Sequence, residues 1–168
     1  SNLNFFSNAL RNDDKISSCI EFGANIGMNM RAIKLLHPAV SLSAIEINKT
    51  AAEQLAAVIG EPNVFNGSIF DYPADQQFDL TLIKGVLIHI NPEMLPTVYE
   101  KLYNASGKYI LVCEYYNPSP VAISYRGHED RLFKRDFAGE MLEKYSDLKL
   151  LDYGFSYKRD TVFPQDDI

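Results

Sequence analysis

The sequence has few cysteines, and its apolar runs are all short. Cys19 and Cys113 are its only cysteines, too few for a disulfide framework or for a zinc site without help from histidine. Each lies in an apolar run, so we predict two reduced core thiols and no metal. No stretch approaches the roughly 20 apolar residues of a membrane span, and no secretory signal pattern is seen. We therefore expect a cytoplasmic protein without a membrane partner.

The chain also lacks an excess of positive charge. Its net charge is −6, whereas a sequence-independent nucleic-acid binder needs a strongly positive face. We therefore expect no nucleic-acid partner. Hydrophobic residues make up 46% and charged residues 23% of the chain, as in ordinary globular proteins. The length of 168 residues suits a single domain over residues 1–168.

Short apolar runs alternate with helical patterns along the chain, which is typical of an α/β fold with a parallel sheet. Residues 117–133 contain two prolines and a glycine, and we predict a long irregular loop there. Helices are predicted over 3–10, 28–36 and 49–59, from Pro92 onward, and over 134–145. Strands are predicted over 17–22, 40–47, 63–66, 78–84, 108–114 and 148–157.

The segment 21–27, Glu-Phe-Gly-Ala-Asn-Ile-Gly, leaves a strand and enters a helix. Gly23 allows a sharp turn, and the free N–H groups of the helix face the same point, where ligands of open α/β sheets bind. A dinucleotide motif fails here at Asn25 and Met28. A methyl-donor motif, an acidic residue followed by three alternate glycines, fails only at Asn25, and Asn tolerates left-handed backbone. A purely structural turn is the alternative.

Two further segments suit an adenosine-type ligand. Glu46 ends the second predicted strand about twenty residues beyond the glycine turn, where an acidic side chain can hold both ribose hydroxyls; alternatively, it caps the next helix. Ser68, Ile69 and Phe70 follow the third strand, where a polar group and a backbone N–H can read the adenine edge while an apolar side chain covers its face.

The fourth predicted strand ends at Lys84, beside the mouth of the first strand. Gly85 allows the backbone to approach a ligand closely. His89 lies just beyond, as a candidate for chemistry or as a structural histidine.

Together these segments resemble class I S-adenosylmethionine-dependent methyltransferases over residues 17–115. The resemblance rests on Glu-Phe-Gly-x-x-x-Gly, Ile-Glu-Ile-Asn, Gly-Ser-x-Phe-Asp and Phe-Asp-Leu-x-x-x-Lys-Gly-Val-Leu-Ile-His-Ile. More narrowly, residues 84–92 and 113–129 resemble the methylases associated with pseudaminic acid biosynthesis. That resemblance implies a cytoplasmic enzyme acting near nonulosonic sugars or their nucleotide-activated forms.

The resemblance implies a Rossmann-like, doubly wound, mostly parallel sheet and S-adenosylmethionine as cofactor. In the family a seventh, antiparallel strand inserts between the fifth and sixth; no convincing candidate follows 148–157, so we expect the last strand to be lacking and one sheet edge to be open. The residues implied to bind the cofactor are Glu21, Phe22, Gly23, Ala24, Asn25, Gly27, Glu46, Ile47, Ser68, Ile69, Phe70, Lys84 and Val86.

The acceptor end should be built by the residues after the fifth strand. Tyrosines there offer flat walls, and arginines suit carboxylate or phosphate, which predicts a small anionic acceptor. The alternative is a solvated loop whose basic residues pair with the interleaved Glu129, Asp130 and Asp136. The candidate acceptor contacts are Tyr115, Tyr125, Arg126 and Arg131, and the candidate bases are His89, Tyr116 and His128, with Glu114 as a further one.

Other functions are weighed against methyl transfer. A nicotinamide-dependent enzyme needs the complete dinucleotide glycine motif, which is absent. A methyltransferase acting on nucleic acid or protein amines would have an Asn-Pro-Pro-Tyr-like motif where residues 84–87 read Lys-Gly-Val-Leu. A non-catalytic S-adenosylmethionine-binding domain stays open, because Asn25 replaces a glycine and the last strand is missing. The sequence indicates neither the methylated atom nor an oligomeric state.

Overall fold

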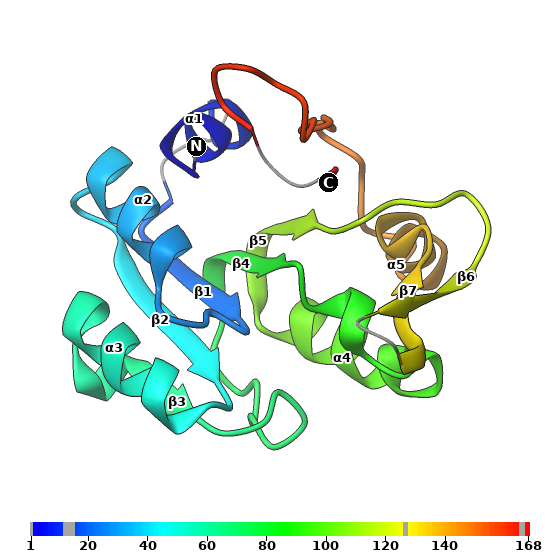
Figure 1. Ribbon diagram of the computed structural model, residues 1–168. Coiled ribbons are helices and arrows are strands. Elements are labelled where there is room, and N and C mark those ends of the chain that lie inside the picture. Colours follow the sequence, from blue (N-terminus) through cyan, green and yellow to red (C-terminus); the bar gives the residue numbers. More distant parts are fainter. Residues whose placement is uncertain (1, 12–15, 126–127, 165–166) are drawn as a thin grey trace.

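A five-stranded parallel sheet organises the protein (Figure 1). The computed structural model describes residues 2–11, 16–125, 128–164 and 167–168. The strand order is β3-β2-β1-β4-β5, so β1 lies between β2 and β4. The strands are β1 (Ser18–Phe22), β2 (Ser41–Glu46), β3 (Val64–Asn66), β4 (Phe78–Lys84) and β5 (Ser106–Cys113).

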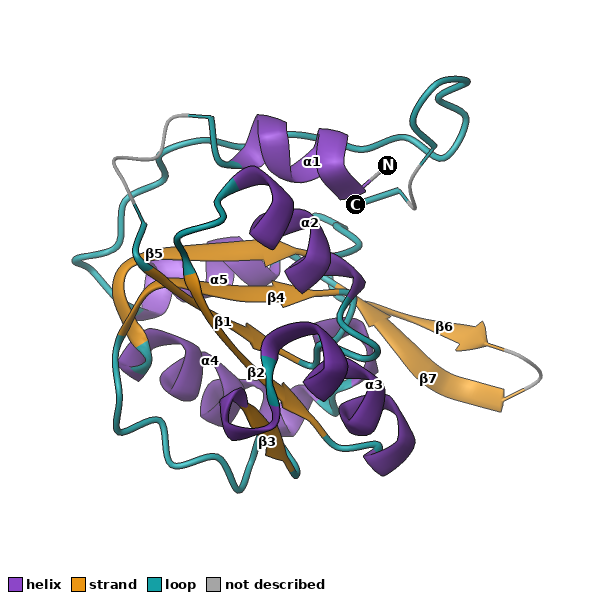
Figure 2. Ribbon diagram, turned by 90° about the vertical axis from the view of Figure 1, so that its left-hand side faces the viewer, coloured by secondary structure: helices purple, strands orange, loops and turns teal. Residues whose placement is uncertain are grey.

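Helices cover both faces of this sheet (Figures 1 and 2). One face packs against α1, α2 and α3, with Phe6, Met30 and Leu55 in its core, and the other packs against α4 and α5, with Val98 and Phe137 in its core. The central strands are therefore covered on both sides, which agrees with the apolar residues that make up most of their inner positions. The helices are α1 (Asn2–Ala9), α2 (Met28–Leu36), α3 (Lys49–Ile59), α4 (Leu95–Asn104) and α5 (Phe137–Lys144), with single 3₁₀ turns at η1 (Glu61–Asn63), η2 (Leu87–His89) and η3 (Pro92–Met94).

The predicted α/β fold is confirmed. The first five predicted strands are present, with ends within two residues of those expected, and the predicted helices 28–36 and 49–59 coincide with α2 and α3. Pro92 starts a 3₁₀ turn, and α4 follows it from Leu95. No helix in the described part of the chain has both the length and the apolarity to cross a membrane.

The prediction of an irregular loop over 117–133 is wrong. An antiparallel hairpin of β6 (Val121–Tyr125) and β7 (His128–Lys134) lies there and projects from the body of the protein (Figure 2). Apolar cross-strand pairs stabilise the hairpin, because Ile123 lies opposite Leu132 and Ala122 opposite Phe133. The last helix consequently begins at Phe137 rather than at residue 134. Asp136 caps this helix, because its carboxylate accepts a hydrogen bond from Gly139 N at 2.8 Å.

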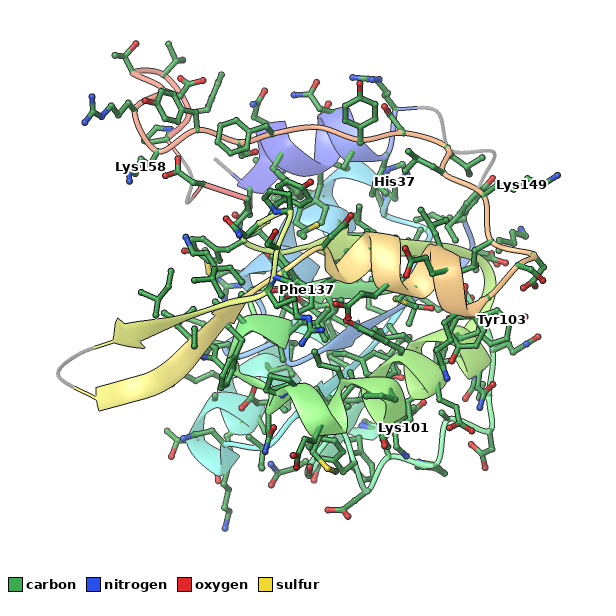
Figure 3. All side chains as sticks on the ribbon, turned by 90° about the vertical axis from the view of Figure 1, so that its right-hand side faces the viewer. His37, Lys101, Tyr103, Phe137, Lys149 and Lys158 are labelled. Atoms are coloured by element: carbon green, nitrogen blue, oxygen red, sulfur yellow. The ribbon has the colours of Figure 1, made fainter. Side chains whose placement is uncertain are left out.

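The predicted sixth strand over 148–157 is also wrong, because that segment is irregular in the structure. Lys149 and Lys158 mark the two ends of its path along α1, on the outside of the molecule (Figure 3). Asp152 forms an ion pair with Arg11 at 2.9 Å. A strand needs a neighbour for its hydrogen bonds, and none of the described residues pairs with the outer edge of β5. The apolar alternation of this segment therefore stays exposed, with Tyr153 87% accessible.

Candidate functional site

The carboxyl ends of β1, β2 and β4 meet at one edge of the sheet. β1 pairs with β2 on one side and with β4 on the other. The loops that follow β1 and β4 thus diverge, and this divergence marks the usual ligand position in open α/β sheets. The candidate cofactor residues from all three strands come together here.

The turn after β1 adopts the left-handed backbone that its sequence predicts. The φ angles of Gly23, Asn25 and Gly27 are 81°, 49° and 82°. A Cβ on Gly23 would lie 2.7 Å from Val86 Cγ2, so only glycine lets the turn approach the loop after β4. Asn25 stands where the methyl-donor motif has its middle glycine, and it adopts the left-handed backbone that Asn tolerates.

The backbone after β1 is tied to the end of β2. Gly23 N and Ala24 N both donate to the Ile45 carbonyl, at 2.9 and 3.0 Å. Ala24 is buried, and Phe22 is fully buried with its ring 5.8 Å from the Tyr72 ring, edge to face. The Phe22 side chain therefore belongs to the core, and only its backbone reaches the site.

Glu46 connects the glycine turn to the start of α3. Its Oε2 accepts a hydrogen bond from Asn25 N and its Oε1 accepts one from Asn48 N, each at 2.7 Å. Asn48 itself caps α3 by accepting from Ala51 N at 3.0 Å, so Glu46 is not the helix cap. Each carboxylate oxygen retains capacity for a second donor, such as a ribose hydroxyl.

Glu21 is completely buried beneath the glycine turn. Its Oε1 accepts a hydrogen bond from Asn29 Nδ2 at 2.6 Å, while its Oε2 has no partner among the described residues. Burial raises the pKa of Glu21 to about 7, partly opposed by the Asn29 hydrogen bond and the charge of Lys84. A buried carboxylate with one oxygen unsatisfied is unfavourable unless a ligand completes it.

Sequence reasoning missed Asn29. It lies in the first turn of α2, and its Oδ1 accepts a hydrogen bond from Asn2 Nδ2 of α1 at 3.1 Å. The only signal was a polar residue in the first turn of the predicted helix, and that signal does not reveal which strand residue it faces.

The turn after β3 lies next to Glu46. Gly67 N and Asn66 Nδ2 both donate to the Glu46 carbonyl, at 3.1 and 2.8 Å, and Ser68 Oγ accepts from Phe70 N at 3.2 Å. Ile69 and Phe70 are half-buried against the core on the α4 side. The structure thus brings the predicted adenine residues beside the predicted ribose residue; Ile47, on the other side of Glu46, is 70% exposed.

The loop after β4 is held by Glu114, which follows β5. Glu114 Oε1 accepts hydrogen bonds from Val86 N at 2.8 Å and from Leu87 N at 2.9 Å. Its Oε2, like that of Glu21, has no partner among the described residues, and burial raises its pKa to about 7. The positive charge of Lys84 lowers the pKa of both glutamates, and Lys84 Nζ lies 5.8 Å from the centroid of the Phe5 ring of α1.

The predicted acceptor residues are only partly placed. His89 and Tyr116 are exposed, and β7 packs against η2, which carries His89. The half-buried Tyr115 has Lys134 Nζ 4.9 Å from its ring centroid. The side chains of Tyr125, His128 and Arg131, and all of Arg126, lie outside the described residues.

A hollow of about 300 Å³ lies at the base of the hairpin, lined by Lys134 and Arg135 together with Pro92 and β6. Arg135 is already paired with Glu140. Among the described residues, no cluster of His, Cys, Asp and Glu is arranged to hold a metal ion.

Neither a family model nor a curated protein matches the sequence. Solved methyltransferase structures do match the fold. The plantazolicin methyltransferase BpumL in complex with SAH has a TM-score of 0.57 at 17% identity over 69% of this chain. The O-methyltransferase of a trans-AT PKS multienzyme of Brevibacillus brevis, in complex with S-adenosyl-L-homocysteine, has a TM-score of 0.61 at 16% identity over 79%. The mitomycin 7-O-methyltransferase MmcR has a TM-score of 0.59 at 16% identity over 77%.

The chain has the fold of these methyltransferases. It spans less than half of their length, 46% of the first two and 42% of the third.

Proposed function

We propose that the chain binds S-adenosylmethionine and transfers its methyl group to a small acceptor. The observation that carries this proposal is Oε2 of the fully buried Glu21, which has no hydrogen-bond partner in the described part of the chain. It lies beneath a turn whose backbone is left-handed at Gly23, Asn25 and Gly27. A carboxylate there suits the ammonium group of the methionine part. The bound SAH of two structural neighbours supports the same ligand.

The electrostatics of the turn favour this cofactor over a dinucleotide. A dinucleotide places its pyrophosphate at the N-terminus of the helix after β1. In this chain that helix is α2, and the buried carboxylate of Glu21 is hydrogen-bonded to its first turn. A negative charge at that point repels a pyrophosphate and attracts a cationic ligand. This agrees with the incomplete dinucleotide motif.

The remaining site residues fit the other parts of the ligand. Both oxygens of Glu46 can accept a further hydrogen bond, which suits the two ribose hydroxyls. Ser68 and its half-buried apolar neighbours, Ile69 and Phe70, suit adenine. Lys84 and Val86 line the part of the edge between Glu21 and Glu114, where the sulfonium would lie.

The bound cofactor would supply an already activated methyl group, so the protein mainly aligns donor and acceptor and excludes water. Glu114 contributes by fixing the backbone of the loop after β4, and this loop ends at His89. For an acceptor that must lose a proton, His89 and Tyr116 are the described side chains exposed beside this loop that could take it.

For the acceptor we propose a small anion, of the nonulosonic type that the narrower sequence resemblance implies. Lys134, which lies over the Tyr115 ring and lines the hollow at the base of the hairpin, supports an anionic group there. The sequence also predicts Arg126 and Arg131 as contacts for this anion. The cytoplasm stays the predicted location.

Calorimetric titration with S-adenosylmethionine and S-adenosylhomocysteine tests the cofactor. We expect micromolar binding of both, no binding of NADH, and loss of binding in Glu46→Ala. Binding of NADH instead would overturn the proposal. Incubation with S-adenosylmethionine and nonulosonic acids or their nucleotide-activated forms, followed by mass spectrometry, then tests the acceptor. Binding of the cofactor without methylation of any acceptor would favour a non-catalytic binding domain.

A further inference from the structure

We propose that Asn29 is a positioning residue, which holds the Glu21 carboxylate ionised and aimed at the ammonium group of the ligand. This inference rests on the proposed binding of S-adenosylmethionine and identifies a residue of that site outside the family's motifs. Its basis is the chain of side chains that links Asn2, Asn29 and Glu21 across α1, α2 and β1.

Within the described ranges, Glu21 has a single hydrogen-bond donor, the amide of Asn29. Asn29 Nδ2 donates to Oε1 at 2.6 Å, and Oε2 has no partner among the described residues. With one oxygen fixed by Asn29, the carboxylate cannot rotate without breaking that bond, so Oε2 keeps one direction. A hydrogen bond to a carboxylate is stronger than one between neutral groups, so this contact favours the ionised form of Glu21.

Asn29 is itself oriented. Its Oδ1 accepts from Asn2 Nδ2 at 3.1 Å, and this contact points the amide nitrogen toward Glu21. The helix that carries Asn2 is anchored independently, because Phe6 of α1 is fully buried in the core. The amide therefore cannot flip without losing both of its contacts.

The charge state of Glu21 depends on groups from every neighbouring strand. Lys84 at the end of β4 favours the carboxylate, and Glu46 at the end of β2 disfavours it. Burial, together with the charge of Glu21, raises the pKa values of the Cys19 thiol on β1 and the Cys113 thiol on β5, so both thiols are neutral. Burial favours the neutral acid of Glu21, and the Asn29 hydrogen bond is the largest opposing contribution.

The test is the pH dependence of S-adenosylhomocysteine binding, measured by calorimetry from about pH 5.5 to about pH 8. Deprotonation of the ligand's α-ammonium group toward the top of this range affects the unaltered chain and its variants alike, so the difference between them reports on Glu21. In the unaltered chain, affinity should rise with a midpoint near the Glu21 pKa of about 7. Asn29→Leu keeps the bulk and removes the donor. We expect its midpoint about one unit higher, with affinity about fivefold weaker at pH 7 and less than twofold weaker at pH 8.

Arg31→Leu, at an exposed position of the same helix, is the matched control and should leave the midpoint unchanged. An Asn29→Leu midpoint equal to that of the unaltered chain, or a loss of affinity that is uniform across pH, would overturn the inference and leave the proposed function intact. If the unaltered chain fails to bind at every pH, the proposed function fails, and the inference with it. Should Asn29→Leu not fold, Asn29→Ala carries the same comparison without adding bulk.

Discussion

Two glutamates at the same edge of the sheet are buried alike and held differently. Glu21 lies within β1 and is held by one side-chain amide, that of Asn29. Glu114 follows β5 and is held by two backbone N–H groups, of Val86 and Leu87. Each keeps one oxygen without a partner among the described residues, and burial raises the pKa of each to about 7.

The two glutamates differ in role because their hydrogen-bond donors differ in kind. Backbone donors belong to the loop itself, so losing Glu114 leaves buried N–H groups unpaired and disturbs the fold. A side-chain donor can be lost without affecting the backbone, so Asn29 adjusts Glu21 without shaping the turn. We infer that Glu114 serves mainly to organise the loop after β4, and Glu21 mainly to meet a ligand.

The largest expected effect tests what the two carboxylates share. Since their pKa values are raised from 4.5 to about 7 by folding, the folded chain binds more protons between these values, and stability falls as pH rises through 7. Lowering the pH from about 8 to about 6 should stabilise the ligand-free chain by about 3 kcal/mol, roughly half from each group. Urea unfolding at each pH measures this.

In the double variant Glu21→Gln with Glu114→Gln this pH dependence should disappear. Backbone hydrogen bonds lower the pKa values of Asp160 and Asp167, so these carboxylates stay ionised over this pH range and do not contribute. An equal slope in the double variant would mean that neither glutamate carries the effect.

The next effect distinguishes the two glutamates. Glu114→Ala should cost about 2–3 kcal/mol of unfolding free energy at pH 6, because the N–H groups of Val86 and Leu87 lose their acceptor. Glu114→Gln keeps an acceptor oxygen, so its cost should be under about 1 kcal/mol. Denaturant titration compares the two variants, and equal costs would refute an organising role for the carboxylate oxygen.

The smallest effect tests the contact between the turn after β1 and the loop after β4. Gly23→Ala combines a left-handed φ of 81° with a Cβ 2.7 Å from Val86 Cγ2 and should cost about 2 kcal/mol. Gly85→Ala has a φ of 66° and no atom within 4 Å of the added Cβ, so about 1 kcal/mol is expected from the backbone alone. Thermal unfolding of both variants separates the cost of the Val86 contact from the cost of the left-handed backbone. A larger loss of stability in Gly85→Ala than in Gly23→Ala would show that Val86 does not restrict the turn.

The sequence predicted some parts of the chain better than others. Over residues 17–115 each strand is followed by a helix or a glycine turn with its own local signal, and the resulting sheet supplies a partner for every strand. Beyond Glu114 the prediction failed twice. The prolines that precede β6 made the segment of the hairpin β6–β7 look irregular. Residues 148–157 have the alternation of a strand but no neighbouring strand among the described residues to pair with. An alternation of apolar and polar residues indicates which side chains favour burial, whereas a strand also requires a partner for its backbone hydrogen bonds.

The candidate site divides in the same way. Glu21, Glu46 and the left-handed turn at Asn25 were predictable, because they rest on residue types at fixed spacing along one stretch of backbone. Asn29 and the role of Glu114 were not. The first is eight residues from Glu21 and the second 28 from Val86, and only the packing of α2 and of β5 against β4 brings these groups within hydrogen-bond distance.

By itself, then, the sequence determined the order of strands and helices as far as Glu114, the glycine turn and the acidic residues at the strand ends, since periodicity and backbone conformation are local properties. The tertiary structure alone decided which donors bind each buried carboxylate and where the apolar segment 148–157 lies. It also decided which carboxylate oxygen has no hydrogen-bond partner among the described residues. Those outcomes depend on distances through space between segments far apart in the chain, and on the cost of burying a polar group without a partner.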